Sequence, residues 1–304
     1  MRIVTYRDLE SKDGLMPLLD HAFRWVFNQA ESERLIKIDP RMKDGPVGFC
    51  ALEDSTIIGH VGVMEVPTRT VNGDIQHVGG IYGVATLPGY TCQGVSTTLM
   101  NTAHHYFIEE GHDFSFLVTS PSLIAHSLYR KLGYSDLIEY PSAYKKIEKG
   151  KQKLNREKTR KLDIDKILSI YDDFTKGKTG FVIRDKTLMK AVAKGERIKP
   201  RQCIVSENGY LIFREDKLGV EIRELVALNA KEMDRLVSLA EHIGRESVYD
   251  RAVIDSNLFD TYASRGYMVL KRSFGVLMVK PLSKNISFNE AYGDNFHISR
   301  LDMF

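Results

Sequence analysis

Two short stretches of this sequence combine residue types and spacings that could perform chemistry. The first, residues 78–94, reads VGGIYGVATLPGYTCQG and runs directly into VSTTLMNTAHHYFIEEG, whose apolar residues have helical spacing. The pattern predicts a strand, a glycine loop and the start of a helix. The first turn of a helix leaves N–H groups unpartnered and partially positive, and glycine lets an anion approach the backbone. The stretch therefore predicts an anion-binding site at Gln93, Gly94, Val95, Ser96 and Thr97.

One alternative needs no ligand. A tight strand-to-helix connection also uses glycine, either for packing or for a positive φ angle. Gly94 would then be structural. A second stretch shifts the balance toward ligand binding.

That second stretch, residues 122–134, reads SLIAHSLYRKLGY and follows an apolar strand pattern at residues 114–118. It predicts a short helix that carries Tyr129 and ends near Gly133, which suits a helix C-cap. Strand, glycine loop, helix, strand, and then a helix with tyrosine shortly before Gly-Tyr resembles the GNAT acetyltransferases. Within them, GGIYGVATLPGY looks like the enhanced-intracellular-survival (Eis-like) type, whose chains carry tandem GNAT domains.

The resemblance implies an N-acetyltransferase that binds acetyl-CoA and transfers the acetyl group to a primary amine of a small molecule, a lysine or an N-terminus. It implies Tyr129 as general acid and the C-terminal carboxylate of Phe304 as general base. The acetyl and pantetheine arm would lie on the backbone of Val84, Ala85 and Thr86, and the pyrophosphate on that of Gln93, Gly94, Val95, Ser96 and Thr97.

The loop differs from the family pattern at three positions. One is Ser96, where the family usually has a small residue. The family usually has arginine where this chain has Thr91, and often a second basic residue where it has Cys92. Arginine makes charge-assisted contacts to phosphate that neither residue can replace. A non-catalytic acyl-CoA sensor or interaction module therefore remains a second hypothesis.

A weaker copy of the first half follows in the second half. Tyr129 to Tyr134 is matched by Tyr262 to Tyr267, whereas only Asn229 and Ala230 separate the strand pattern ending at Leu228 from the next helix. Because no glycine loop lies there, we expect Tyr262 to be structural. The predicted fold is α/β (α+β with a mixed sheet), with two tandem GNAT-like domains and no recognisable cofactor loop in the second.

The chain of 304 residues suits two domains of ordinary size. We place a catalytic domain at residues 1–148, a basic linker at 149–161, a degenerate GNAT-like domain at 162–282 and a tail at 283–304. Expected strands of the first domain are residues 1–6, 47–52, 56–66, 68–71, 75–84 and 114–118, with a helix at 15–27 and one or two closing strands within 136–147. Glu65 is a reserve candidate for the base.

Composition narrows the remaining classes. No apolar run approaches the ~20 residues that span a bilayer, and charge near the N-terminus argues against a signal peptide. We therefore expect a cytoplasmic protein that does not associate with a membrane. Three separated cysteines, Cys50, Cys92 and Cys203, predict neither disulfides nor a metal site. The net charge of the whole chain is only +3, which argues against a nucleic-acid partner. Because the linker is basic, an RNA-associated role stays as a third hypothesis. Association into a homo-oligomer is also left open.

Overall fold

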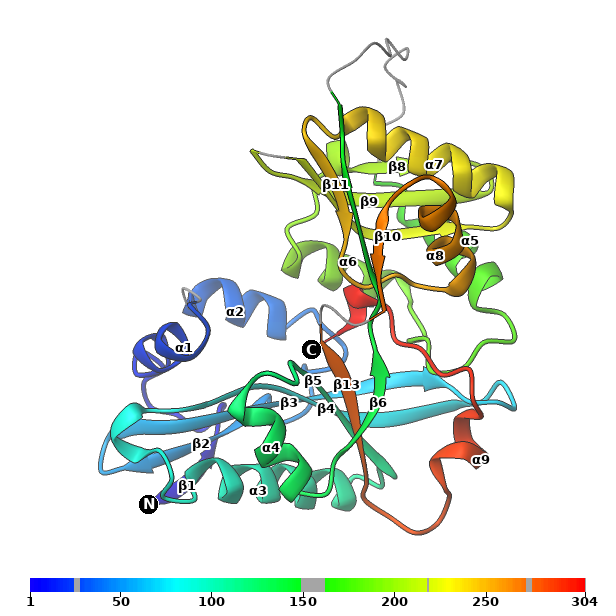
Figure 1. The fold of residues 1–304 in the computed structure, drawn as a ribbon. Helices are drawn as coiled ribbons and strands as arrows, with labels where there is room; N and C mark the ends of the chain where they lie inside the picture. The colour runs from blue at the N-terminus through cyan, green and yellow to red at the C-terminus, as the bar shows by residue number, and fades with distance from the viewer. Residues whose placement is uncertain (25–27, 149–161, 218, 272–274, 304) are drawn as a thin grey trace. The chain divides into compact units, whose positions relative to one another are not determined.

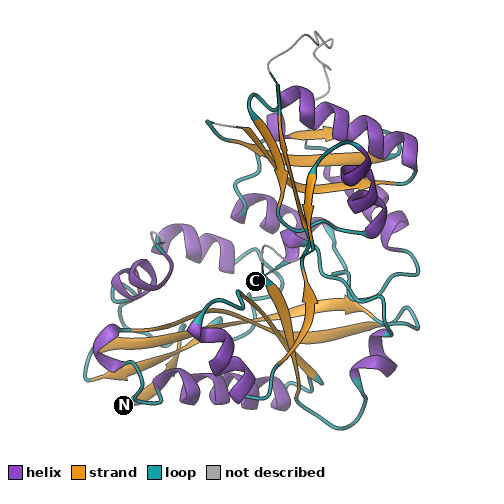
Figure 2. Cartoon of the chain, viewed as in Figure 1, coloured by secondary structure: helices purple, strands orange, loops and turns teal. Residues whose placement is uncertain are grey.

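Two mixed β-sheets form the framework of the chain (Figures 1 and 2). The computed structural model describes residues 1–24, 28–148, 162–217, 219–271 and 275–303. The chain divides into a first unit, residues 1–137 and 277–294, and a second unit, residues 138–276 and 295–303. Helices pack on each sheet, so the predicted α/β class with mixed sheets is confirmed.

The first unit has a seven-stranded sheet in the order β1-β2-β3-β4-β5-β13-β6. Its strands are β1 (Arg2–Thr5), β2 (Gly48–Glu53), β3 (Thr56–Arg69), β4 (Ile75–Thr86), β5 (Phe114–Thr119), β6 (Ser135–Glu139) and β13 (Val276–Pro281). Its helices are α1 (Leu15–Phe23), α2 (Gln29–Ile36), α3 (Val95–Glu109), α4 (Ile124–Lys131) and α9 (Phe288–Tyr292), with the 3-10 turn η1 (Pro88–Tyr90). Helices α1 and α3 both contact β3 and β4, and Figure 1 shows them on opposite faces of the sheet.

The β3–β4 hairpin is longer than the sequence pattern predicts. The expected break near Pro67 is wrong, because β3 continues through it to Arg69 and Pro67 lies opposite His77 in the register. The turn itself uses Gly73 with a φ of 84°, a conformation that glycine adopts without steric cost. The Asn72-Gly73 signal therefore located the turn correctly although the strand lengths were underestimated.

The second unit has a six-stranded sheet in the order β12-β7-β11-β10-β9-β8. Its strands are β7 (Ser142–Lys146), β8 (Cys203–Val205), β9 (Gly209–Glu215), β10 (Gly219–Ala227), β11 (Ser247–Asp250) and β12 (Met268–Leu270). Its helices are α5 (Ile164–Thr175), α6 (Lys186–Gly195), α7 (Ala230–Ile243) and α8 (Ser256–Ser264), with the 3-10 turns η2 (Pro200–Gln202) and η3 (Arg300–Asp302).

The two sheets exchange one strand each. Strand β13 lies between β5 and β6 of the first sheet, and β7 lies between β11 and β12 of the second. The sequence-based boundaries had placed β7 in the first domain and β13 in the second, because each follows its neighbours along the chain. Strand pairing depends on which edge is open and which face is buried, and local sequence does not encode that choice.

A buried charge network fixes the core of the second unit. The Arg184 guanidinium donates to both oxygens of Glu224, at 2.7 and 2.8 Å, and to Asp302, at 2.7 to 3.0 Å. All three side chains have at most 1% exposure. Burial alone would raise the pKa of Glu224, but Arg184 and hydrogen bonds from Ser299 and Tyr210 hold it below its ordinary value. The network thus anchors the segment around Asp302 to β10.

Replacing Arg184 tests this network. Arg184→Met leaves two buried carboxylates without a cation, so we expect the free energy of unfolding in urea to fall by about 3–5 kcal/mol. Lys186→Met is the matched control, because Lys186 pairs with Asp165 at 2.7 Å on the exposed surface, and such pairs contribute no more than about 1 kcal/mol. Equal losses in the two variants would contradict the role given to the network.

Candidate active site

Strand β4 leaves part of its edge unpaired where it separates from β5. The two strands run parallel and pair at Gly79 with Ser115 and at Gly80 with Phe116. Beyond these pairs, β4 continues to Thr86 and keeps its antiparallel register with β3 on the other side. The segment that holds Val84, Ala85 and Thr86 therefore presents backbone groups on which an extended ligand arm can lie.

A β-bulge bends this same segment. His60 lies opposite Ala85 and Gly62 lies opposite Tyr82, so Gly83 and Val84 together face one residue of β3. Gly83 has a φ of 57°, and its carbonyl lies 2.8 Å from His60 Nδ1. Bulges of this kind re-aim a strand and often lie next to active sites.

His60 itself is buried, with 5% exposure, and its ring packs edge-on against Tyr82. Burial lowers the pKa of His60, and the bond to the Gly83 carbonyl opposes this only in part. The ring is therefore neutral at pH 7 and carries its proton on Nδ1, which donates to the carbonyl. Sequence reasoning missed His60, because a lone histidine in an apolar strand gives no signal of its partner.

The start of α3 has the features expected of an anion site. Gly94 is its N-cap residue with a φ of 82°. Among the residues that the structure describes, no side chain caps the helix and no atom lies within 4 Å of the position that a Cβ would occupy. Thr86 Oγ1 and Ser96 Oγ are 2.6 Å apart, which joins the end of β4 to the first turn. The Gln93 side chain donates to the Gly89 carbonyl at 2.9 Å and closes the loop. Backbone N–H groups of the first turn are thus left for a ligand.

The structure places the predicted binding residues in this one region. Val84, Ala85 and Thr86 are at the end of β4, and Gln93, Gly94, Val95, Ser96 and Thr97 form the loop end and the first turn of α3. Val95 is buried with 4% exposure and anchors the turn, while Gln93 and Gly94 are exposed. Thr91 and Cys92 are exposed on the same loop and bring no positive charge to it.

The corresponding connection in the second unit is built differently. The side chain of Asn229 caps α7 by accepting from the backbone N–H of Glu232 at 2.9 Å, and Glu232 adds a carboxylate to the first turn. An adjoining pocket of about 510 Å³ is lined in part by Asp173, Asp255 and Asp260. A capped, acidic helix start is unfavourable for phosphate.

Tyr129 lies on α4 with 6% exposure. Burial raises the pKa of its hydroxyl to about 12, so it is protonated at neutral pH. Among the described residues its hydroxyl has no hydrogen-bond partner, and its ring packs edge-on against Tyr134. It is therefore a proton donor that is not committed to an internal bond.

A hydrogen-bonded chain behind Tyr129 fixes α4 in place. The Tyr134 hydroxyl lies 2.7 Å from Ser115 Oγ and 3.0 Å from His104 Nε2. Burial and the nearby Lys280 lower the pKa of His104 to about 3, so its neutral Nδ1 accepts from Lys280 at 3.2 Å. Helix α4 is thereby tied to α3, β5 and β13.

Tyr262, the counterpart of Tyr129 in the second unit, has a different environment. It is fully buried, and its hydroxyl donates to Asp250 at 3.0 Å. Burial raises its pKa well above the ordinary value. Its hydroxyl is used inside the fold, as the structural interpretation of the sequence expected.

Several candidates lie elsewhere or outside the described residues. Glu65, the reserve base, accepts from the Tyr106 hydroxyl of α3 at 2.9 Å. Phe304 and the basic linker at 149–161 fall outside the described residues, while Lys145, at the start of the basic run, lies in β7 and donates to Glu241 at 2.9 Å. Among the described residues no group of histidine, cysteine and carboxylate side chains forms a metal site.

Comparison with known proteins gives this geometry a context. Residues 12–134, less than half of the chain, match the model of the Acetyltransferase (GNAT) family. This match supports an acyltransferase. A search of curated proteins finds no match.

Solved structures share the fold over most of the chain. A GCN5-related N-acetyltransferase from Kribbella flavida has a TM-score of 0.66 at 14% identity, covering 92% of this chain and 72% of its own. One from Anabaena variabilis has 0.63 at 17%, covering 93% and 73%, and Eis1 from Mycobacterium abscessus has 0.61 at 15%, covering 93% and 74%. At such identities these structures establish the fold alone.

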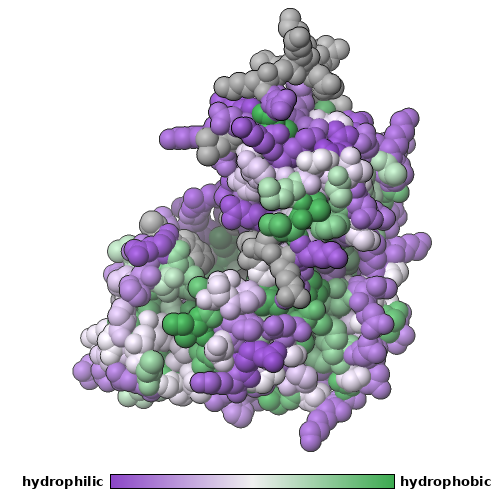
Figure 3. Space-filling view, viewed as in Figure 1, coloured by the Kyte–Doolittle hydropathy of each residue, from purple (hydrophilic) through white to green (hydrophobic). Residues whose placement is uncertain are grey.

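No helix among the described residues has both the length and the apolar character to cross a bilayer. On the face shown in Figure 3, hydrophilic and hydrophobic residues alternate over short distances.

His60 gives the sharpest test of the bulge. In His60→Leu the half-buried Gly83 carbonyl loses its donor, so we expect a loss of about 1 kcal/mol in the free energy of unfolding and weaker acetyl-CoA binding. In His60→Asn the amide nitrogen replaces Nδ1, and we expect most of both properties to be retained. Urea denaturation and calorimetry measure them, and similar losses in the two variants would show that the hydrogen bond is not what matters.

Proposed function

We propose that this protein is an acetyl-CoA-dependent N-acetyltransferase of the tandem, Eis-like type, which transfers an acetyl group to a primary amine. The observation that carries the proposal is the combination of an open β4 edge with an uncapped helix start, joined by the Thr86–Ser96 hydrogen bond. Both binding elements of the co-substrate would thus be held by one rigid connection. We further expect the first unit to be the catalytic domain and the second unit to be the degenerate one, with the cytoplasm as the location of the protein.

The fit to acetyl-CoA follows from the chemistry of each element. Unpartnered N–H groups at Val95, Ser96 and Thr97 suit the pyrophosphate, because they supply donors and partial positive charge. The edge of β4 at Val84, Ala85 and Thr86 suits the amide-containing pantetheine arm, which can pair with a strand. Leu123 and Ile124 at the start of α4 are 56% and 91% exposed, so the helix that carries Tyr129 begins with apolar surface that a ligand could contact.

Acetyl transfer to an amine needs a polarised carbonyl, a neutral nucleophile and a proton for the departing thiolate. In our proposal a backbone N–H near Ala85 or Thr86 donates to the thioester oxygen. The Tyr129 hydroxyl protonates the sulfur, and its raised pKa keeps that proton available. The Phe304 carboxylate accepts the amine proton, directly or through a water molecule. Asp302, two residues before it, is anchored by Arg184.

A second candidate is a non-catalytic acyl-CoA sensor. The absence of basic side chains at Thr91 and Cys92 favours it, because phosphate contacts would then rest on backbone groups alone. Binding without turnover would support this candidate. An RNA-associated role would rest on the basic linker at 149–161, which lies outside the described residues.

Substitution of Gly94 tests the binding site. Gly94→Asp places a carboxylate at the proposed phosphate position, so we expect acetyl-CoA affinity measured by calorimetry to fall at least tenfold. Gly73→Asp is the matched control, since Gly73 also has a positive φ and open space around it but lies in the β3–β4 turn. Equal affinities in the two variants would place the co-substrate elsewhere.

Substitution of Tyr129 tests the chemistry. Removing a general acid lowers turnover by about 10²- to 10⁴-fold, so Tyr129→Phe should reduce CoA release in the presence of an amine while acetyl-CoA affinity is unchanged. Tyr262→Phe is the control from the second unit and should affect stability rather than turnover. In the same assay, a few residues added after Phe304 should reduce turnover if its carboxylate is the base. Full turnover in Tyr129→Phe would refute the acid role.

A further inference from the structure

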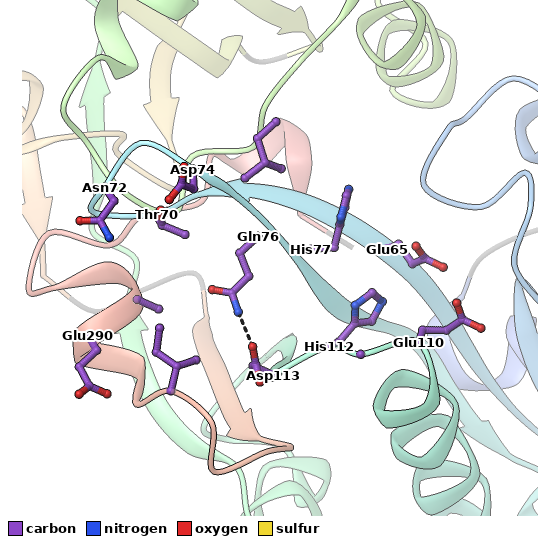
Figure 4. A pocket seen from close by; sticks show the side chains of 14 residues that line it. Glu65, Thr70, Asn72, Asp74, Gln76, His77, Glu110, His112, Asp113 and Glu290 are labelled. Atoms are coloured by element: carbon purple, nitrogen blue, oxygen red, sulfur yellow. Dashed lines mark hydrogen bonds between the residues drawn. The ribbon is translucent and has the colours of Figure 1, made fainter.

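A second, acidic pocket lies in the first unit, away from the proposed acetyl-CoA site. We define the acidic pocket as a cavity of about 460 Å³ between the β3–β4 turn, the turn after α3 and the segment before α9 (Figure 4). Its volume falls within the range of small-molecule sites, about 300–1,000 Å³. The residues that carry its charge are Glu65, Asp74, Glu110, Asp113 and Glu290.

The described residues that line the pocket include five carboxylates and neither lysine nor arginine. Asp113 accepts from Gln76 at 2.8 Å and from Ser283, and Glu290 accepts from Ser287, so these two help to build the walls. Asp74 and Glu110 are exposed and form no ion pair with any described residue. Their charges are therefore available to a ligand.

Two buried polar atoms of the lining lack partners. His112 Nε2 and Thr70 Oγ1 have no hydrogen-bond partner among the described residues. His112 is 94% buried, since its exposure is 6%, and Figure 4 shows its ring among the side chains of His77, Glu65 and Glu110. Burial lowers the pKa of His112, although Glu65 opposes this, so the ring is neutral and can accept a hydrogen bond. A buried polar atom without a partner is costly, which suggests that a ligand supplies one.

The walls of the acidic pocket are rigid. The Tyr292 hydroxyl lies 2.7 Å from Thr68 Oγ1, and Phe288 and Tyr292 pack on Phe114. The backbone N–H of Val71 donates to the Ala291 carbonyl at 2.9 Å. These contacts hold the segment around α9 against the hairpin, so the cavity is preformed.

The chemistry of the lining selects an organic cation. A metal ion is not favoured, because no three ligating side chains of the described residues converge on one point. Anions are repelled by the carboxylates. We propose that the acidic pocket binds a linear polyamine, whose spaced ammonium groups pair with Asp74 and Glu110 while one of them donates to His112 Nε2.

This site is distinct from the site proposed for acetyl transfer. The acidic pocket contains Glu110 and His112, just beyond the C-terminal end of α3, whereas Gly94 is at its N-terminal end. Fifteen helical residues separate them by about 22 Å. A polyamine bound here would act as an effector rather than as the acceptor, and the inference does not depend on the proposed function.

Calorimetry with spermidine as the probe tests the proposal, using the full chain without acetyl-CoA in low-salt buffer. We expect one site whose affinity falls as NaCl is raised. Exposed ion pairs each change affinity by no more than about fivefold, so Asp74→Asn/Glu110→Gln should weaken binding about tenfold. His112→Phe, which keeps an aromatic ring next to Phe107, should weaken it by a similar factor.

The control carries the same loss of charge in the second unit. Glu207→Gln/Glu246→Gln removes two exposed carboxylates there and should bind spermidine like the unmodified chain. Urea denaturation of every variant establishes that it is folded. Absence of binding at millimolar spermidine, equal affinity of the two double variants, or unchanged affinity in His112→Phe would each overturn the proposal.

Discussion

The hydrogen bond from His60 to the Gly83 carbonyl holds the one irregularity on which the candidate active site depends. A regular β4 would alternate its side chains and backbone groups without interruption up to Thr86. The bulge inserts one residue, which turns the end of the strand and allows it to lead through η1 into the uncapped start of α3. His60 is buried and neutral, so the donor of this bond lies in a site that is largely removed from water.

The second unit has a similar arrangement of strands and helices, but its polar groups at the corresponding places are bonded within the fold. Its strand β10 also has a register shift, between Ile222 and Glu224, but Glu224 turns into the core and binds Arg184. The following helix begins with Asn229, which satisfies its own N–H groups. The Tyr262 hydroxyl likewise donates a hydrogen bond to Asp250. The helix start and the tyrosine hydroxyl therefore both have hydrogen-bond partners in the second unit, whereas their counterparts in the first unit are open to a ligand.

Much of this could be predicted from the sequence, and the exceptions have physical reasons. Glycine loops, helix starts and the turn at Asn72-Gly73 are local signals, so the strand, loop and helix around Gly94 were located correctly. The strand exchange of β7 and β13 could not be, because pairing is decided by distant edges. The same holds for His60, His112 and Arg184. The role of each residue depends on partners that are remote in the chain. The spacing of apolar residues along the sequence does not reveal such partners.

Helix α3 connects the two proposed sites electrostatically. Its aligned peptide dipoles place partial positive charge at Gly94, where no side chain competes for it, and partial negative charge near Glu109. The carboxylates Glu110 and Asp113 add full negative charge at that second end, together with Asp74 from the hairpin. An anion is therefore favoured at one end of the helix and a cation at the other, and the buried face of the same helix packs on β3 and β4 between them. Because both ends belong to this one packed element, the fold sets the distance between the end that favours an anion and the end that favours a cation.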